Sequence, residues 1–165
     1  EDIAAVVGMP ASGIYRYFGG KADILAAAFH RAADRVSGDV AEIVAAEPDP
    51  EQAIIGLIAA YVTRSFDDPA LAYVYYTERA NLPTADQAIL RNIQRSTVAA
   101  WVRLLVAARP ELTATQARFA VHAALALVVD IGRLVQYDNT EESRACVRRM
   151  MEATVLGQRA AVPLS

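Results

Sequence analysis

The sequence predicts an all-α protein with a small N-terminal helix-turn-helix head and a larger helical domain. Apolar residues recur at helical spacing along nearly all of the 165 residues, and no segment shows the alternation typical of a strand. Hydrophobic residues make up 55% of the chain, and many are alanine and leucine, which favour helix. We assign residues 1–37 to the head and residues 38–165 to the larger domain. The surplus of apolar residues indicates a further buried surface, such as an oligomer interface or an apolar pocket.

The composition argues against several classes of protein. The net charge is −3, so there is no global basic field that would indicate nucleic acid. The single cysteine, Cys146, excludes an internal disulfide and a cysteine metal cluster, and it fits the cytoplasm, where we place the protein. The N-terminus has no signal-peptide pattern. Residues 119–135 are the most apolar run, but about 17 residues that include Asp130 and Arg133 are too few and too charged to favour a membrane span.

The head is predicted from two short helices. The chain opens inside a helical pattern, and we expect further residues before Glu1 in the full protein. Residues 1–7 form the first helix, which Gly8 ends. Pro10 suits the first turn of a second helix at residues 11–18. Two short helices joined by a turn that contains glycine form a helix-turn-helix, whose second helix enters the DNA major groove.

The second helix has two distinct faces at about 100° per residue. One face is an apolar stripe that consists of Ala11, Ile14, Tyr15 and Phe18. The other is a small, hydrogen-bonding surface with one positive charge, made of Ser12, Gly13, Arg16 and Tyr17. A glycine inside a helix costs about 1 kcal/mol relative to alanine. Close approach of a DNA backbone is one way to offset that cost.

Three helices follow the two short ones, and the first of them begins within the head. The Gly19-Gly20 pair breaks the second helix, and apolar residues then keep helical spacing over residues 21–46. Two nearby prolines make residues 47–50 a loop. The next helix covers residues 51–66, and a tyrosine-rich helix covers residues 71–81 after a break that contains a proline.

Three further helices complete the chain. The first is expected over residues 85–108, with Thr84 as its cap, and the second over residues 114–137, with Thr113 as its cap. The last is expected to run to about residue 160, with Asn139 or Thr140 as its cap. The alanine-rich residues 119–135, with Gly132, permit close contact between helices. Together with the last helix they would form a four-helix bundle between two copies of the chain. An intramolecular core is the alternative use of these faces.

The stretch IAAVVGMPASGIYRYFGGKADIL closely resembles the helix-turn-helix signature of the TetR family of bacterial transcriptional regulators. The matching positions are Gly8, then Ile14-Tyr15-Arg16-Tyr17-Phe18, then Lys21, then Asp23-Ile24-Leu25. The signature covers only residues 3–25, but its spacing and residue types agree throughout. The remaining helices are similar in architecture to the family's ligand-binding and dimerisation domain.

The resemblance implies a homodimer that binds a palindromic DNA operator and responds to a small-molecule effector. We interpret the protein as a repressor, with the last two helices as the dimer interface and no membrane partner. By position in the signature, Gly13 and Arg16 face the groove, Ser12, Tyr15 and Tyr17 contact phosphate or base edges, and Lys21 contacts phosphate. Arg16 is the only one of these side chains able to make a bidentate contact to guanine, with a phosphate contact as its alternative.

Three features depart from the family's pattern. The family's first helix and its basic N-terminal arm are absent from this sequence. Pro10 stands where a capping Ser or Thr is common, and Ala22 stands where an acidic residue is frequent. Residues 1–37 carry as many acidic as basic side chains, so affinity for DNA would depend on dimerisation and on residues before Glu1.

The candidate effector-binding residues are aromatic or titratable side chains of the larger domain, namely Tyr61, Tyr73, Tyr76, Trp101 and His122. Tyrosine and tryptophan combine apolar surface with a polar group, as ligand pockets require. Core packing is the alternative role for each of them. No catalytic, metal-ligand or cofactor motif stands out, so we predict no enzyme activity and no cofactor. A helical ligand-binding module without sequence-specific DNA binding is the alternative function.

Overall fold

The computed structural model describes residues 18–135 and 138–157, except for the side chains of residues 72, 73, 76 and 132–135. In this part the chain forms six α-helices and one 3-10 helix, and no strand. The elements are α3 (Lys21–Ala46), α4 (Pro50–Asp67), α5 (Pro69–Glu78), η1 (Arg79–Asn81), α6 (Thr84–Ala108), α7 (Ala114–Val135) and α8 (Glu141–Leu156). The predicted all-α fold is confirmed.

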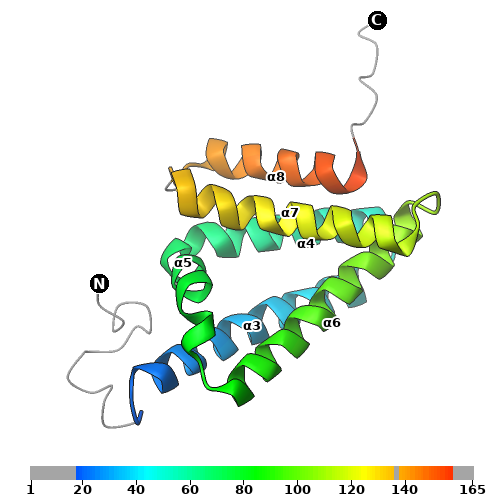
Figure 1. Cartoon of the computed structure of the whole chain (residues 1–165). Helices are drawn as coiled ribbons and strands as arrows, with labels where there is room; N and C mark the ends of the chain where they lie inside the picture. Colours follow the sequence, from blue (N-terminus) through cyan, green and yellow to red (C-terminus); the bar gives the residue numbers. More distant parts are fainter. Residues whose placement is uncertain (1–17, 136–137, 158–165) are drawn as a thin grey trace, which may run out of the picture.

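The helices form two layers that α5 connects at one side (Figure 1). One layer contains α4, α7 and α8, and the other contains α3 and α6. α4 is the central helix, because it contacts α3, α5, α6, α7 and α8. The two layers converge at the end of the molecule opposite α5 and diverge toward α5.

The main core lies where α4 packs against α6, α7 and α8. It is entirely apolar, and no polar or charged residue is buried in the described part of the chain. Its fully enclosed members include Ile54, Ile58, Leu105, Val121 and Met151. Truncating such a side chain to alanine typically costs about 2–5 kcal/mol. The α4 helix is therefore held by packing from several sides.

Side-chain caps determine where several helices begin. Asp49 caps α4 and Asp68 caps α5, each by accepting backbone N–H bonds from the first turn. Thr113 and Gln116 form a capping box at α7, in which each side chain accepts from the other's backbone N–H. Thr140 caps α8 by accepting from the backbone of its first turn. The predicted caps Thr113 and Thr140 are confirmed.

The predicted cap Thr84 is wrong. Thr84 is the first residue of α6 itself, after the extended Pro83, and no side chain caps this end. The Gln87 side-chain amide instead donates to the carbonyl of Leu82 at 2.9 Å, which holds the preceding loop against the helix.

The tyrosine-rich helix also differs from the prediction of residues 71–81. α5 begins at Pro69, because the Asp68 carboxylate accepts the backbone N–H of Leu71 at 3.1 Å and proline suits the first turn. The last three residues tighten into the 3-10 helix η1. This short element lies between α5 and the loop that leads to α6.

By length and composition alone, α7 could cross a membrane over Ala114–Ile131. The estimate from residues 119–135 missed this property because the helix begins earlier. In the structure Val121, Ala124 and Val128 are fully buried, and α7 packs against α6 and α8. This packing covers one face of α7, and only 22% of the apolar window is buried within the single chain.

Candidate functional site

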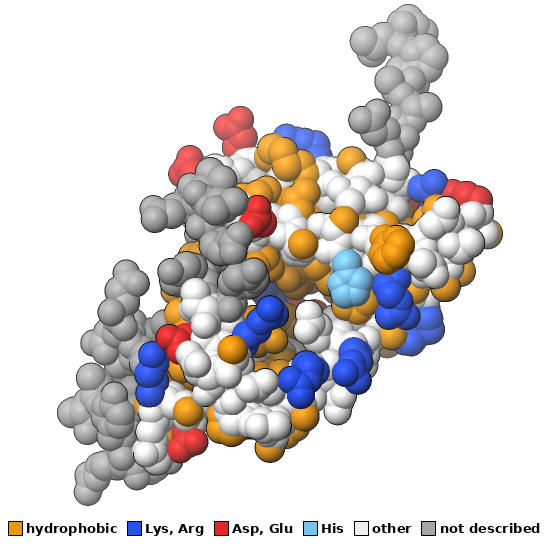
Figure 2. All heavy atoms as spheres, viewed as in Figure 1, with side chains coloured by type: hydrophobic (Ala, Val, Ile, Leu, Met, Phe, Trp, Pro, Cys, Tyr) orange, Lys and Arg blue, Asp and Glu red, His pale blue; other side chains and the backbone are white. Residues whose placement is uncertain are grey.

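A cavity of about 880 Å³ lies between the two layers of helices. Its lining residues come from α3, α4, α5, α6 and α7 and from the segments that flank α5. Figure 2 shows the hollow on this face of the molecule, with basic side chains near it. The volume falls within the range of about 300–1,000 Å³ that is usual for small-molecule sites.

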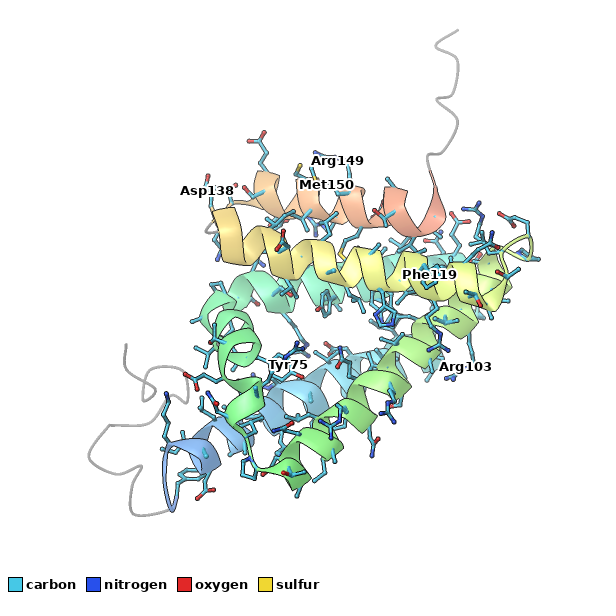
Figure 3. All side chains as sticks on the ribbon, in the orientation of Figure 1. Tyr75, Arg103, Phe119, Asp138, Arg149 and Met150 are labelled. Atoms are coloured by element: carbon cyan, nitrogen blue, oxygen red, sulfur yellow. The ribbon has the colours of Figure 1, made fainter. Side chains whose placement is uncertain are left out.

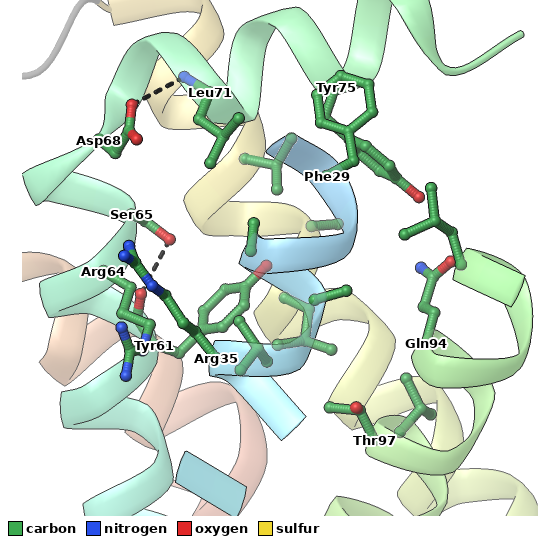
Figure 4. Close-up of a pocket in the computed structure, with 18 of the residues that line it drawn as sticks. Phe29, Arg35, Tyr61, Arg64, Ser65, Asp68, Leu71, Tyr75, Gln94 and Thr97 are labelled. Atoms are coloured by element: carbon green, nitrogen blue, oxygen red, sulfur yellow. Dashed lines mark hydrogen bonds between the residues drawn. The ribbon is translucent and has the colours of Figure 1, made fainter. Parts of the chain in front are cut away.

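Aromatic side chains form much of the cavity wall. The rings of Phe29 and Tyr75 meet edge to face, with centroids 5.0 Å apart and planes at 89°. Tyr61 and Trp101 form a second edge-to-face pair at 6.3 Å and 80°. The first pair joins α3 to α5, and the second joins α4 to α6. Figure 4 shows Phe29, Tyr61 and Tyr75 around the cavity.

Small side chains on α3 create the room. Phe29, Ala32, Ala33 and Val36 all line the cavity, and their spacing places them on one face of the helix. Larger residues at positions 32 and 33 would project into the cavity. The apolar stripe of α3 is therefore partly a cavity wall and only partly a core contact.

Several charged lining residues are held by partners within the protein. Arg64 donates through two guanidinium N–H groups to the carboxylate of Asp39, and this hydrogen bond raises the pKa of Arg64 against the opposing effect of burial. Asp67 accepts from Arg144 at 2.8 Å. Asp68 is engaged as the cap of α5. Each of these three groups therefore already has a hydrogen-bond partner within the protein.

Arg35 is in a different situation. It lines the cavity and is exposed, and it makes no hydrogen bond or ion pair with the residues that the structure describes. Figure 4 shows its side chain extending from α3 toward Ser65 and Arg64 of α4. An unpaired positive charge thus stands at the wall of a mainly apolar cavity.

Trp101 carries a second unpaired group. The residue is only 2% exposed, and its indole N–H has no hydrogen-bond acceptor among the described residues. A buried donor without a partner costs about 1–3 kcal/mol. Such a group at a cavity wall is an exception within a well-paired structure.

The structure brings three of the predicted effector-binding residues together. Tyr61, Trp101 and His122 line this one cavity, from α4, α6 and α7 respectively. Tyr73 and Tyr76 belong to α5, but their side chains lie outside the described part. The assignment of all five to an effector site stays a prediction.

Sequence reasoning missed the lining residues Phe29, Arg35, Arg64 and Tyr75. Phe29 belongs to the predicted apolar stripe of α3, and the two alanines beside it were the available signal of free space. Tyr75 lies in the same tyrosine-rich segment as the predicted residues. The arginines gave no signal, because on an amphipathic helix they resemble ordinary solvated residues.

Of the predicted DNA-binding residues, the structure describes only Lys21. It is the exposed first residue of α3, and its ammonium donates to the Glu78 carboxylate at 3.1 Å. Ser12, Gly13, Tyr15, Arg16 and Tyr17 lie outside the described residues. Among the residues that are described, no group of three or more His, Cys, Asp or Glu side chains could hold a metal ion.

No protein-family model and no curated protein matches the sequence. Solved structures do resemble it. A regulatory protein of the TetR family from Rhodococcus RHA1 has a TM-score of 0.72 and 23% identity, over 96% of this chain and 85% of its own. A TetR-family transcriptional regulator from Bordetella parapertussis 12822 has a TM-score of 0.78 and 16% identity, over 98% and 88%. The chain has the TetR fold.

The TetR fold was the expectation from the N-terminal signature, and the likeness confirms it for the helices that were matched by architecture alone. FadR from Bacillus subtilis, a transcriptional regulator solved with stearoyl-CoA, also shares it, with a TM-score of 0.67 and 18% identity over 96% of this chain and 89% of its own. At sequence identities this low, the likeness shows a shared fold and does not show which ligand this protein binds. The chemistry of the cavity has to be argued from its own residues.

Proposed function

We propose that this chain is a DNA-binding transcriptional regulator, a repressor that a small, partly apolar effector releases from a palindromic operator in the cytoplasm. The observation that carries the proposal is a cavity of about 880 Å³ within the TetR fold. One wall of that cavity is α3, which begins directly after the predicted helix-turn-helix. The cavity and the predicted head thus share one continuous helix.

The α3 helix is the proposed link between effector and DNA. Its middle lines the cavity, and Lys21 at its start is bound to Glu78 at the end of α5. A ligand that contacts both helices would favour one position of α3 over another, and so one spacing of the two heads in a dimer. The effector can shift this equilibrium only by its difference in affinity for the two states, and a tenfold difference corresponds to about 1.4 kcal/mol.

The proposed homodimer interface is the outer face of α7 and α8. Phe119 on α7 is 68% exposed and Met150 on α8 is 45% exposed, and Figure 3 shows them on these two helices. Only 22% of the apolar window Ala114–Ile131 is buried within the single chain. Two copies that pack these faces together would bury the remainder as a four-helix bundle. This arrangement needs no membrane to cover the apolar face of α7.

The proposed DNA contacts follow the helix-turn-helix signature. Gly13 and Arg16 would face the major groove, with Arg16 reading guanine, and Lys21 would contact phosphate. Replacing Arg16 with Ala should relax sequence preference at one position of each half-site. Equal loss of affinity for all sequences would instead make Arg16 a phosphate contact.

Selection of bound DNA from a random pool by the full-length protein tests the proposal. We expect enrichment of a palindrome whose two half-sites are separated by about one helical turn of DNA, or a multiple of it. Binding without any enriched sequence would overturn the proposed regulator. That result would favour the alternative, a helical ligand-binding module with no specific DNA site.

A further inference from the structure

We propose that the effector is an organic monoanion with an aromatic or aliphatic body, and that Arg35 is the residue that pairs with its charge. This inference rests on the proposed function, because it assumes that the cavity is the effector site. It adds the chemical class of the ligand and names the residue that selects it.

The argument begins with the pairing of the charged lining residues. Arg64 is bound to Asp39, Asp67 accepts from Arg144, and Asp68 caps α5. Arg79 and Asp130 also have partners. Among the charged cavity residues that the structure describes, Arg35 is therefore the one without a hydrogen-bond or ion-pair partner.

An unpaired guanidinium favours an anion over a cation or a neutral molecule. Its planar fork forms two parallel hydrogen bonds to a carboxylate or a similar oxyanion, about twice as strong as neutral hydrogen bonds. The cavity also provides the apolar partner for the rest of the ligand. Phe29, Leu71, Tyr75, Leu90 and Val98 all line it.

The charges of the lining restrict the charge of the anion. The cavity is lined by three carboxylates, Asp67, Asp68 and Asp130, and by three guanidinium groups, of which only Arg35 has no partner, so a single negative charge finds a counter-charge and a second one does not. A carboxylate therefore fits better than a phosphate monoester. The two headgroups share the recognition chemistry and can be separated by experiment.

The test uses two probes with the same apolar skeleton. Anilinonaphthalenesulfonate carries one negative charge, and N-phenylnaphthylamine carries none. Trp101 is the only tryptophan in the chain and lines the cavity, so energy transfer from Trp101 to the probe reports binding to the protein, and the effect of the Arg35 variant assigns that binding to the cavity. Both probes are titrated into the full-length protein.

We expect Arg35→Gln to weaken binding of the anionic probe about tenfold or more. The same variant should change the affinity for the neutral probe by less than about twofold. The matched control is Arg103→Gln, since Arg103 is also exposed but lies on α6 outside the cavity lining (Figure 3). This control should leave the affinities for both probes unchanged. Circular dichroism of both variants checks that the fold is retained.

Competition for the anionic probe then separates the headgroups. Naphthoate should displace the probe more effectively than naphthyl phosphate, and naphthylmethylamine, a cation of similar size, should be the weakest competitor. Preference for the phosphate would overturn the monoanion assignment. An Arg35→Gln variant that binds both probes as the wild type does would overturn the role of Arg35.

The outcomes also distinguish failure of this inference from failure of the proposed function. If the anion binds through Arg35 but never changes affinity for the selected DNA, the anion site stands and the regulator proposal fails. If the protein binds a palindrome but Arg35→Gln has no effect on either probe, the regulator proposal stands and the anion inference fails.

Discussion

Trp101 belongs to both the core and the cavity, and its two roles have opposite energetic signs. Its ring is buried with Val98, Val102 and Leu105 of the main core and favours the folded state. Its indole N–H lacks an acceptor among the described residues and opposes the folded state. The residue therefore offers a test of how much an unsatisfied donor costs at this site.

We predict that Trp101→Phe destabilises the fold by less than about 2 kcal/mol, because loss of ring volume is partly offset by removal of the unpaired donor. Trp101→Ala should cost about 3–5 kcal/mol, as other large core truncations do. Urea unfolding followed by circular dichroism measures both. A loss well above about 2 kcal/mol in Trp101→Phe would mean that the indole N–H is satisfied.

The Arg64–Asp39 pair leads to a second prediction at the residue scale. Asp39→Asn removes the counter-charge of Arg64, which would then present a second free guanidinium at the cavity. The stability cost should be about 1 kcal/mol or less, because the pair is partly exposed. Affinity for anilinonaphthalenesulfonate should rise.

The control for Asp39→Asn is Asp34→Asn, which removes an exposed carboxylate from the same helix without releasing a paired arginine. A similar rise in probe affinity in both variants would show a general change in charge. Only a rise specific to position 39 supports the release of Arg64.

Residue types alone pointed to part of the site. The side chains of Tyr61, Trp101 and His122 are of types that suit ligand binding, and the structure places them at one cavity. Arg35 could not be found in this way. Which side of α3 faces α4 depends on contacts between helices, and the spacing of apolar residues along α3 does not contain that information.

At the scale of helices, the Lys21–Glu78 pair ties the start of α3 to the end of α5. The pKa of Glu78 is lowered from its ordinary value of 4.5, first by the side-chain hydrogen bond from Asn81 and then by Lys21. A carboxylate with a lowered folded-state pKa contributes stability above its unfolded pKa, and this contribution is lost as the pH falls through the folded pKa.

We therefore predict that Glu78→Gln lowers the melting temperature at about pH 7 and has progressively less effect as the pH falls below about 4.5. Thermal unfolding of wild type and variant across this pH range measures the difference. Glu152→Gln, a change in a carboxylate of α8, is the control. A difference between wild type and Glu78→Gln that stayed constant with pH would contradict the predicted linkage.

The bounds of most helices could be predicted because prolines and caps mark them locally. The helix at residues 21–46 was predicted as observed, and Thr113 and Thr140 cap as expected. Thr84 shows the limit of this reasoning. Sequence identifies a residue that is able to cap, but backbone geometry decides whether it stands before the first turn or within it.

At the scale of the whole molecule, the exposed apolar residues predict how copies of the chain associate. We expect Phe119→Glu to convert a dimer to a monomer, because a charge would have to be buried in the proposed interface. Light scattering after size-exclusion chromatography gives the mass. The matched control is Ile89→Glu, since Ile89 is a 47% exposed apolar residue on α6, outside α7 and α8.

The dimer prediction has a clear contrary outcome. If Ile89→Glu dissociated the dimer and Phe119→Glu did not, the interface would involve α6 instead.

The overall topology could not be predicted from the sequence. Each helix could be recognised alone, but the separation of two layers by α5, which creates the cavity, depends on contacts between residues far apart in the chain.

The alanine wall of α3 has an evolutionary consequence. Ala32 and Ala33 line the cavity, and neither belongs to the main core around α4. Substitutions at these two positions can therefore reshape the chamber in small steps while the scaffold persists. A lineage that carries this fold could change its chemical signal through a few mutations on one helix, without first losing and then rebuilding its architecture.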